Sequence, residues 1–257
     1  MTQLVYLDLF NNELTGTIPT EIALLTQLTF LSFANNGLTS TIPAELGLMT
    51  QLTYLELTSN RFSSTIPSEI GLISQLEVLL VYNNTFTSPI PTEITLMTKL
   101  RYLDLAINQF DSTIPSELGL LSQLEVLFLG NNQLTSTIPT EIATLTQLKV
   151  LFLVNNLVTG TVPSELGLLS QMESLNLASN QLTGGIPSEL GLISQMYGLF
   201  LNANQLTSTI PTELGLISNL NYLYLDENRL TGSIPSEIES LLLLERLLID
   251  NNQLSGT

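Results

Sequence analysis

The side chains of this chain that could do chemistry are almost all carboxylates. Its 257 residues include 23 aspartates and glutamates, six lysines and arginines, no histidine and no cysteine. Without cysteine there can be no thiolate nucleophile, disulfide or zinc–thiolate site, and without histidine the commonest general base and metal ligand is missing. Paired carboxylates could serve a glycosidase, but nothing in the sequence indicates a deep cleft that would raise one carboxyl pKa. We therefore expect no enzyme activity, no cofactor and no metal site.

Ten glutamates recur at intervals of 24 residues. They are Glu21, Glu45, Glu69, Glu93, Glu117, Glu141, Glu165, Glu189, Glu213 and Glu237. A cation-binding strip is one interpretation, but carboxylates ~5 Å apart in water repel by under about 1 kcal/mol, so a helix-start residue copied with a repeat is preferred. Asp226, Glu227 and Asp250, with Asn202 nearby, could hold Ca²⁺ through oxygen ligands. A solvated acidic surface is the preferred interpretation of that cluster.

The charge balance excludes two classes of partner. The formal net charge is −17, whereas nucleic acid and anionic membrane surfaces both favour lysine and arginine. The mean hydropathy of +0.34 is high, yet no stretch approaches the roughly 18 consecutive apolar residues of a membrane span. We expect neither nucleic-acid binding nor direct membrane insertion by this segment.

The whole chain is periodic. Asparagines lie 24 residues apart at Asn12, Asn36, Asn60, Asn84, Asn108, Asn132, Asn156, Asn180, Asn204, Asn228 and Asn252. Prolines follow the same interval at Pro19, Pro43, Pro67, Pro91, Pro115, Pro139, Pro163, Pro187, Pro211 and Pro235. Two lattices in one phase indicate a tandem array rather than a chain with internal domain boundaries. We treat residues 1–257 as one solenoid of about eleven units.

One unit, from Leu148, reads LKVLFLVNNLVTGTVPSELGLLSQ. Its frame, L-x-x-L-x-L-x-x-N-x-L followed by T-G/S-T-I-P, resembles the plant-type leucine-rich repeat (LRR) of receptor-kinase ectodomains, polygalacturonase inhibitors and many protist proteins. The resemblance implies an α/β repeat solenoid, a curved horseshoe or superhelix. Its parallel β-sheet would form the concave face, with short helical or 3-10 segments on the convex side.

Each residue type in the unit has a place in such a rung. Leu148, Leu151 and Leu153 would point inward from the strand, because alternate side chains of a strand face opposite sides. The asparagine amide would satisfy backbone groups of its own rung and of the neighbouring rung. Pro139 and Glu141 fit the first turn of a short helical segment, where proline supplies a fixed φ and glutamate favours the positive end of the peptide dipoles.

Large rings occupy the strand positions that face away from the core. Exposed apolar area beyond a few hundred Å² marks an interaction site, and the resemblance places ligand contacts at the same positions. The candidate ligand-binding residues are Val78, Leu80, Tyr82, Val126, Phe128, Val150, Phe152, Val154, Phe200, Tyr222 and Tyr224. A polar notch at Ser174, Asn176 and Gly198 would interrupt this patch. The competing explanation is strand propensity alone, which also favours tyrosine, phenylalanine and valine.

A second surface carries regularly spaced threonines. One column is Thr15, Thr39, Thr87, Thr135, Thr159, Thr183, Thr207 and Thr231. The other is Thr17, Thr41, Thr65, Thr113, Thr137, Thr161, Thr209 and Thr257. If the segment is extended, the two columns form an outward ladder that resembles the T-x-T arrays of ice-binding solenoids, with breaks at Pro89, Asp111 and Gly185. Ice binding is therefore the alternative function.

The expected partner is a peptide or an extended protein segment, with a glycan stacked on the rings as a further alternative. Asp8, Glu56, Asp104, Asp226 and Asp250 flank the rings and favour a ligand with positive charge. The repeat ends lack the polar caps that solenoids need, so we expect an internal piece of a larger protein. An extracellular or cell-surface location is preferred, with the cytosol as the competitor.

Overall fold

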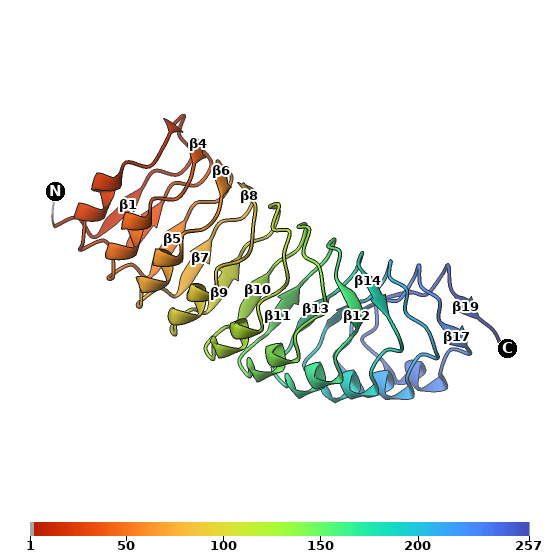
Figure 1. The fold of residues 1–257 in the computed structure, drawn as a ribbon. Coiled ribbons are helices and arrows are strands. Elements are labelled where there is room, and N and C mark those ends of the chain that lie inside the picture. Colours follow the sequence, from red (N-terminus) through yellow and green to blue (C-terminus); the bar gives the residue numbers. More distant parts are fainter. Residues whose placement is uncertain (1–2, 257) are drawn as a thin grey trace.

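Each repeat contributes one three-residue strand to a continuous parallel sheet. The computed structural model describes residues 3–256, and its main sheet has eleven strands in chain order (Figure 1). They are β1 (Tyr6–Asp8), β3 (Phe30–Ser32), β5 (Tyr54–Glu56), β7 (Val78–Leu80), β9 (Tyr102–Asp104), β10 (Val126–Phe128), β11 (Val150–Phe152), β13 (Ser174–Asn176), β15 (Gly198–Phe200), β16 (Tyr222–Tyr224) and β18 (Arg246–Leu248).

The register of this sheet equals the sequence period. Val126 lies opposite Val150 and Phe128 lies opposite Phe152, and the other neighbouring strands pair with the same offset of one repeat. The central residue of each strand is a leucine that points into the core, and Leu127, for example, is fully buried. In this sheet, equivalent positions of neighbouring repeats therefore lie opposite one another, as the sequence predicts.

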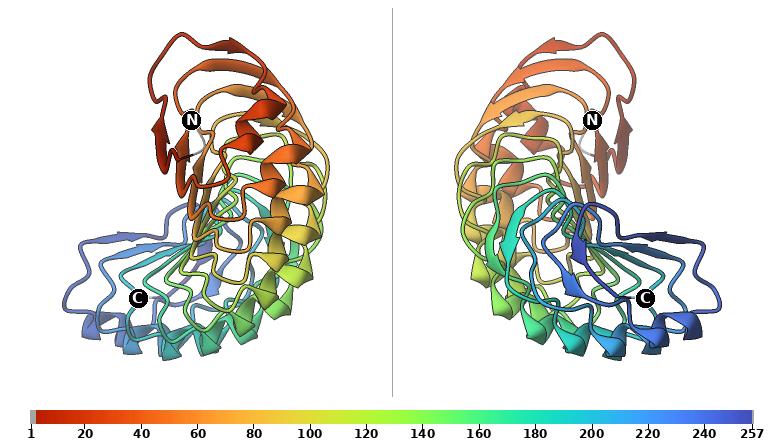
Figure 2. Two further views of the ribbon diagram at one scale, coloured as in Figure 1. Left: turned by 90° about the vertical axis from the view of Figure 1, so that its left-hand side faces the viewer. Right: turned by 90° about the vertical axis from the view of Figure 1, so that its right-hand side faces the viewer.

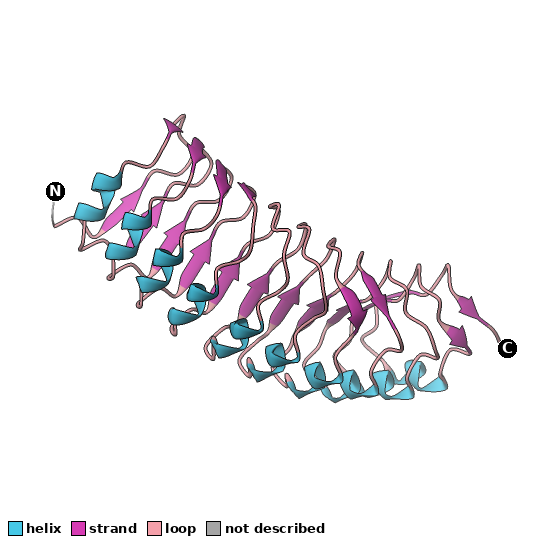
Figure 3. Cartoon of the chain, in the orientation of Figure 1, coloured by secondary structure: helices cyan, strands magenta, loops and turns pink. Residues whose placement is uncertain are grey.

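The opposite side of the solenoid is formed by short 3-10 helices. Within the described residues these are η1 (Thr20–Leu24), η2 (Ala44–Leu48), η3 (Ser68–Leu72), η4 (Thr92–Leu96), η5 (Ser116–Leu120), η6 (Thr140–Thr144), η7 (Ser164–Leu168), η8 (Ser188–Leu192), η9 (Thr212–Leu216) and η10 (Ser236–Ser240). Figure 3 shows them along one edge of the molecule for its whole length. At five residues each, none of these described helices has the length or the apolar run needed to cross a bilayer.

The repeated proline lies one residue earlier than expected. Pro139 does not belong to the first turn but precedes η6 as its N-cap, with φ −64° and the extended ψ of 134°. Glu141 is the second residue of the helix. The proline therefore supplies a fixed φ at the extended residue that leads into the helix.

Buried asparagines connect the rungs. The Asn132 amide donates hydrogen bonds to the carbonyls of Leu129 in its own rung, at 3.0 Å, and of Leu105 in the preceding rung, at 3.1 Å. Its Oδ1 accepts the backbone N–H of Phe110 at 3.1 Å. The same pattern recurs along the asparagine lattice, as predicted, because a buried turn must satisfy its backbone groups.

The core is one continuous apolar cluster. Phe62, Phe86 and Phe110 replace leucines inside it, are fully buried and stack with centroids 6.2 Å apart. The end rungs bury their apolar residues less completely, and Leu7 and Leu247 are only partly covered. The two end views in Figure 2 show that successive rungs rotate about the long axis, so the solenoid is a twisted superhelix with its helices along the outer edge.

Between sheet and helices, some rungs form a second, interrupted set of strands. β2 (Thr15–Gly16), β4 (Gly37–Ser40), β6 (Arg61–Ser64) and β8 (Thr85–Phe86) make one sheet, and β12 (Thr159–Thr161) pairs with β14 (Gln181–Thr183). A third pair joins β17 (Thr231–Gly232) and β19 (Gln253–Leu254). Some threonines of the two columns lie in these strands, for example Thr159 and Thr161 in β12, and the others lie in the irregular segments between them.

Candidate functional site

The rings of the middle rungs meet on the concave sheet. Phe128 and Phe152, which end β10 and β11, have ring centroids 5.0 Å apart, and Tyr102 meets Phe128 edge-on at 5.6 Å. We call Tyr102, Phe128 and Phe152 the central ring cluster. Val126 and Val150 lie opposite one another beside it. All five side chains are half-buried, because the rings lie partly on one another and on the strands.

Tyr102 was not among the residues expected to bind a ligand, although it completes this cluster. The repeat position of Tyr102 could have indicated this, because Tyr102 is the counterpart of Val126 one repeat earlier. Parallel strands paired in register bring such residues side by side. Tyr82 forms no ring pair within residues 3–256, so it extends the surface without joining the cluster. Val78, Leu80 and Val154 are half-buried residues on the same face.

A second group of rings begins two rungs beyond Phe152. Phe200 meets Tyr224 edge-on at 5.0 Å and stacks with Tyr222 at 6.5 Å. The expected polar notch between the two groups is not an open gap. A Cβ added at Gly198 would lie 2.7 Å from the ring of Phe200, which therefore covers the glycine backbone. Ser174 is buried as well.

The closest ring stack lies near the start of the chain and was also outside the expected set. Tyr6 and Phe30 stack at 4.1 Å, and Phe30 and Tyr54 at 4.5 Å. Burial, with Glu56 nearby, raises the pKa of Tyr54 to about 12, so its hydroxyl stays protonated. The Ser32 hydroxyl donates to Glu56 at 2.9 Å. This stack combines apolar rings with carboxylates.

Asp104 is a half-buried carboxylate beside the central ring cluster. Its Oδ1 accepts the backbone N–H of Ala106 at 2.9 Å. This hydrogen bond favours the charged form, but burial outweighs it and raises the pKa of Asp104 to about 6. Phe128 lies opposite Asp104 on the next strand. A lone carboxyl of this kind can titrate, yet it has no second carboxylate partner for acid–base catalysis.

An alternating row of charges borders the central ring cluster. Glu125 accepts hydrogen bonds from Lys149 Nζ at 2.8 Å and from Arg101 Nε at 2.7 Å. These bonds hold the pKa of Glu125 below its usual range. Glu77 and Glu173 continue the row at the same repeat position. A shallow hollow of about 210 Å³ lies here, lined by Glu77, Val78, Arg101, Tyr102, Glu125 and Val126.

The acidic cluster of Asp226, Glu227 and Asp250 lies at the far end of the sheet. In the described part of the chain, no group of three or more aspartates or glutamates is placed to hold a metal ion. Asp226 Oδ1 is buried without a hydrogen-bond partner, and burial raises the pKa of that carboxyl. We interpret the cluster as an acidic surface.

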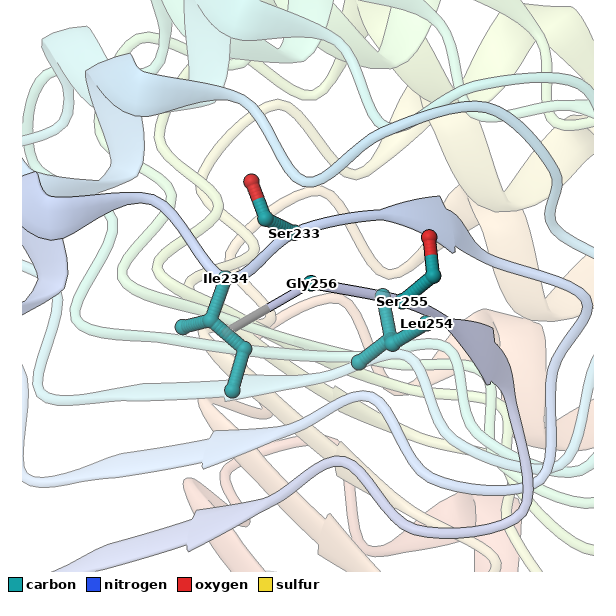
Figure 4. Close-up of a pocket in the computed structure, with 5 residues that line it drawn as sticks. All are labelled: Ser233, Ile234, Leu254, Ser255 and Gly256. Atoms are coloured by element: carbon teal, nitrogen blue, oxygen red, sulfur yellow. The ribbon is translucent and has the colours of Figure 1, made fainter.

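A further hollow, of about 180 Å³, lies near the last rung. Figure 4 shows its lining of Ser233, Ile234, Leu254, Ser255 and Gly256. None of these side chains titrates in the physiological range, so the hollow offers no group for acid–base chemistry.

The threonine columns face outward as predicted, but their backbone is not flat. The residue between paired threonines has a positive φ, for example 70° at Ser136 and 80° at Gly160. The pairing is also staggered, because Thr161 lies opposite Thr183 of the next rung. Thr183 donates its hydroxyl to the Gly160 carbonyl at 3.1 Å. The prediction that this segment is extended and forms a regular double ladder is therefore wrong. Thr257, the last threonine of the second column, lies outside the described residues.

Comparisons with known proteins agree with this architecture. The family model described as Leucine Rich Repeat matches residues 3–25, 27–49, 51–72, 99–121, 123–145, 171–193 and 219–241. A search of curated proteins finds no match.

Three solved structures illustrate the similarity. The Arabidopsis receptor kinase HAESA, in complex with the peptide hormone IDA and the co-receptor SERK1, is 34% identical over 97% of this chain, with a TM-score of 0.92. PEPR1–AtPEP1 is 34% identical over 99%, with a TM-score of 0.88. A plant ice-binding protein shares the fold at 23% identity over 98% of this chain and 80% of its own, with a TM-score of 0.80.

The chain spans 42% of the HAESA chain and 39% of the PEPR1 chain. The matched repeats, the in-register rungs and these structures together show that the chain belongs to the Leucine Rich Repeat family and is a plant-type leucine-rich repeat protein.

Proposed function

We propose that this chain is a non-catalytic recognition module that binds a peptide or an extended protein segment on its concave sheet. The observation that carries the proposal is the central ring cluster, in which Tyr102, Phe128 and Phe152 of three consecutive strands meet on the solvent side. Core packing does not require rings there, because the leucines of the same strands already fill the core. Rings on a rigid sheet provide apolar contact area at low entropic cost.

The similar structures support this proposal at the level of the class of ligand. HAESA is described in complex with a peptide hormone, and the match to HAESA covers 97% of this chain. For this chain we propose the same class of partner and an extracellular location. The ligand-contacting residues are proposed to be the central ring cluster, the valines beside it and the rings at Phe200, Tyr222 and Tyr224.

The charge of the concave face defines the ligand further. Asp104 and Glu56 stand beside rings, while Arg101 and Lys149 are occupied by Glu125. The acidic groups therefore outweigh the free basic groups, and a ligand with apolar and basic side chains complements the face better than an acidic one. A glycan would also stack on rings and stays the second ligand class.

The test is a binding measurement with a peptide selected from a random library against the purified chain. Phe128→Ser with Phe152→Ser should weaken its affinity at least about tenfold, because two ring contacts are lost. The circular dichroism spectrum should not change, since both rings lie on the surface side of the sheet. The matched control is Tyr197→Ser, which removes an exposed ring outside the concave rows. Unchanged affinity in the double variant would refute this site.

Ice binding is the alternative function, and it predicts a different result. The staggered pairing and the positive φ at Ser136 and Gly160 work against the flat lattice that ordered water requires. We expect round ice crystals and no thermal hysteresis for the purified chain. Faceted crystals that disappear in the Thr137→Lys, Thr161→Lys variant would move the function to the threonine face.

A further inference from the structure

A row of exposed leucines runs along the convex side of the solenoid. Each is the last residue of a 3-10 helix, and each is 53% to 68% exposed. The row consists of Leu24, Leu48, Leu72, Leu96, Leu120, Leu168, Leu192 and Leu216. We call it the leucine row. It follows the helices seen in cyan in Figure 3.

The fold does not need leucine at this position. The apolar role of each helix is filled by its third residue and by the residue that follows it, as with the buried Leu166 and Leu169 around Leu168. Two helices carry a polar residue at the position of the row instead, Thr144 in η6 and Ser240 in η10. Both helices keep the 3-10 conformation, so core packing does not explain the other eight leucines.

Close stacking of the helices brings the leucines of neighbouring rungs side by side. A Cβ added at Gly191 of η8 would lie 2.3 Å from the backbone oxygen of Glu213 in η9. Gly47, Gly71 and Gly167 show similar distances, 2.2 to 2.5 Å, to the next helix. The glycines thus bring the helices together, and the leucines form two apolar runs, Leu24 to Leu120 and Leu168 to Leu216, separated by Thr144. Grouped exposed apolar side chains of this kind mark an interaction site.

A row of carboxylates accompanies the leucine row. The second residue of every described helix is an exposed glutamate, three residues before the position of the row. None of these ten helices contains a lysine or arginine. The ion pairs within residues 3–256 involve Glu125 with Arg101 and Lys149, not these helices. The convex strip is therefore apolar and anionic, and no basic group of the described chain neutralises it.

We propose that the leucine row is a docking surface for an amphipathic basic polypeptide segment. The apolar side chains of such a segment cover the leucines, and its lysines or arginines face the glutamates. A second copy of this chain fits less well, because it would add its own unneutralised glutamates to the same interface. An anionic lipid surface is repelled for the same reason. This surface is independent of the concave face proposed above.

The test uses the purified chain and two synthetic helical peptides of equal length, one built from leucine and lysine and the other from leucine and glutamate. We expect the leucine–lysine peptide to bind, with an affinity that falls as salt is added. The leucine–glutamate peptide should not bind measurably. Equal binding of the two peptides would overturn the proposal, because charge would then play no part.

Two sets of variants assign the binding to this surface. Leu168→Thr, Leu192→Thr and Leu216→Thr together should weaken binding of the leucine–lysine peptide at least about tenfold, because burial of three leucines is lost. The fold should persist, since Thr144 occupies the same position naturally. Glu165→Gln, Glu189→Gln and Glu213→Gln together should weaken binding and reduce its salt dependence.

The matched control for both sets is Ser170→Ala, Ser194→Ala and Ser218→Ala, which changes exposed residues of the same rungs outside the leucine row. This control should bind like the unmodified chain. Unchanged binding in the threonine variant would refute the proposal. Concentration-dependent dimers of the unmodified chain in sedimentation, lost in the threonine variant, would also overturn it, because a second copy would then cover the row.

Discussion

Asp104 allows a quantitative prediction about stability and pH. Its carboxyl has an ordinary pKa of 3.8, and burial raises this value to about 6 in the folded protein. The folded state therefore binds more protons than the unfolded state between these two values, and stability falls as pH rises through this window. The difference between the two pKa values corresponds to at most about 3 kcal/mol, at 1.36 kcal/mol per pKa unit. Above about pH 6 the folded protein carries this full cost.

Replacing Asp104 by asparagine should remove the cost without disturbing the backbone. Asn176 occupies the same repeat position, and its Oδ1 accepts the N–H of Ala178 at 3.1 Å, just as Asp104 accepts that of Ala106. We expect Asp104→Asn to raise the free energy of unfolding by about 1 to 3 kcal/mol at pH 7.5. The gain should shrink to near zero at pH 4, where the aspartate of the unmodified chain is neutral in the folded state.

The assay is urea unfolding followed by circular dichroism at pH 4, 5, 6 and 7.5. The reciprocal variant Asn176→Asp serves as the matched control, and it should lose stability as pH rises. A stabilisation by Asp104→Asn that is equally large at pH 4 and pH 7.5 would show that packing, not charge, is responsible. No stabilisation at pH 7.5 would refute the argument that the carboxylate is buried at a cost.

Two further predictions concern the rungs themselves. Asn132→Ala should lower the free energy of unfolding by about 3 kcal/mol or more, because several buried backbone groups lose their partner. Asn12 lies at an exposed end of the lattice, so Asn12→Ala should lower the free energy of unfolding by under about 1 kcal/mol. Equal losses in urea unfolding would contradict the bridging role. Gly191→Ala should lower the free energy of unfolding by about 2 kcal/mol, because the new Cβ overpacks against the next helix. At Gly185 nothing lies nearer than 3.6 Å to a new Cβ, so Gly185→Ala should change the free energy of unfolding by no more than about 0.5 kcal/mol. An unchanged stability of Gly191→Ala would show that the helices can separate.

The sequence by itself determined the repeat, the register and the inward residues. Copies of one 24-residue unit can bury their leucines only by stacking, and identical copies stack most simply with each residue over its counterpart. This is why Phe128 could be placed beside Phe152 and Phe62 in the core. The asparagines followed for the same reason, because a turn buried between two rungs needs a side chain that both donates and accepts.

The tertiary structure decided what each surface residue meets. The ring of Phe200 folds over Gly198 of its own strand. Burial on the sheet surface raises the pKa of Asp104. The repeat pattern predicts neither effect, because both depend on how side chains lie in the folded chain. The positive φ at Ser136 and the offset pairing of Thr161 with Thr183 give staggered threonine columns instead of a flat ladder.

The leucine row shows what hydropathy alone does not decide. Leu168 and Leu169 are adjacent and chemically identical, yet the first is 68% exposed and the second fully buried. Hydropathy alone treats the two leucines alike, whereas the repeat frame assigns Leu166 and Leu169, but not Leu168, to the core. The turn of a five-residue 3-10 helix, pressed against its neighbour through Gly167, directs one leucine to solvent and leaves the next in the core.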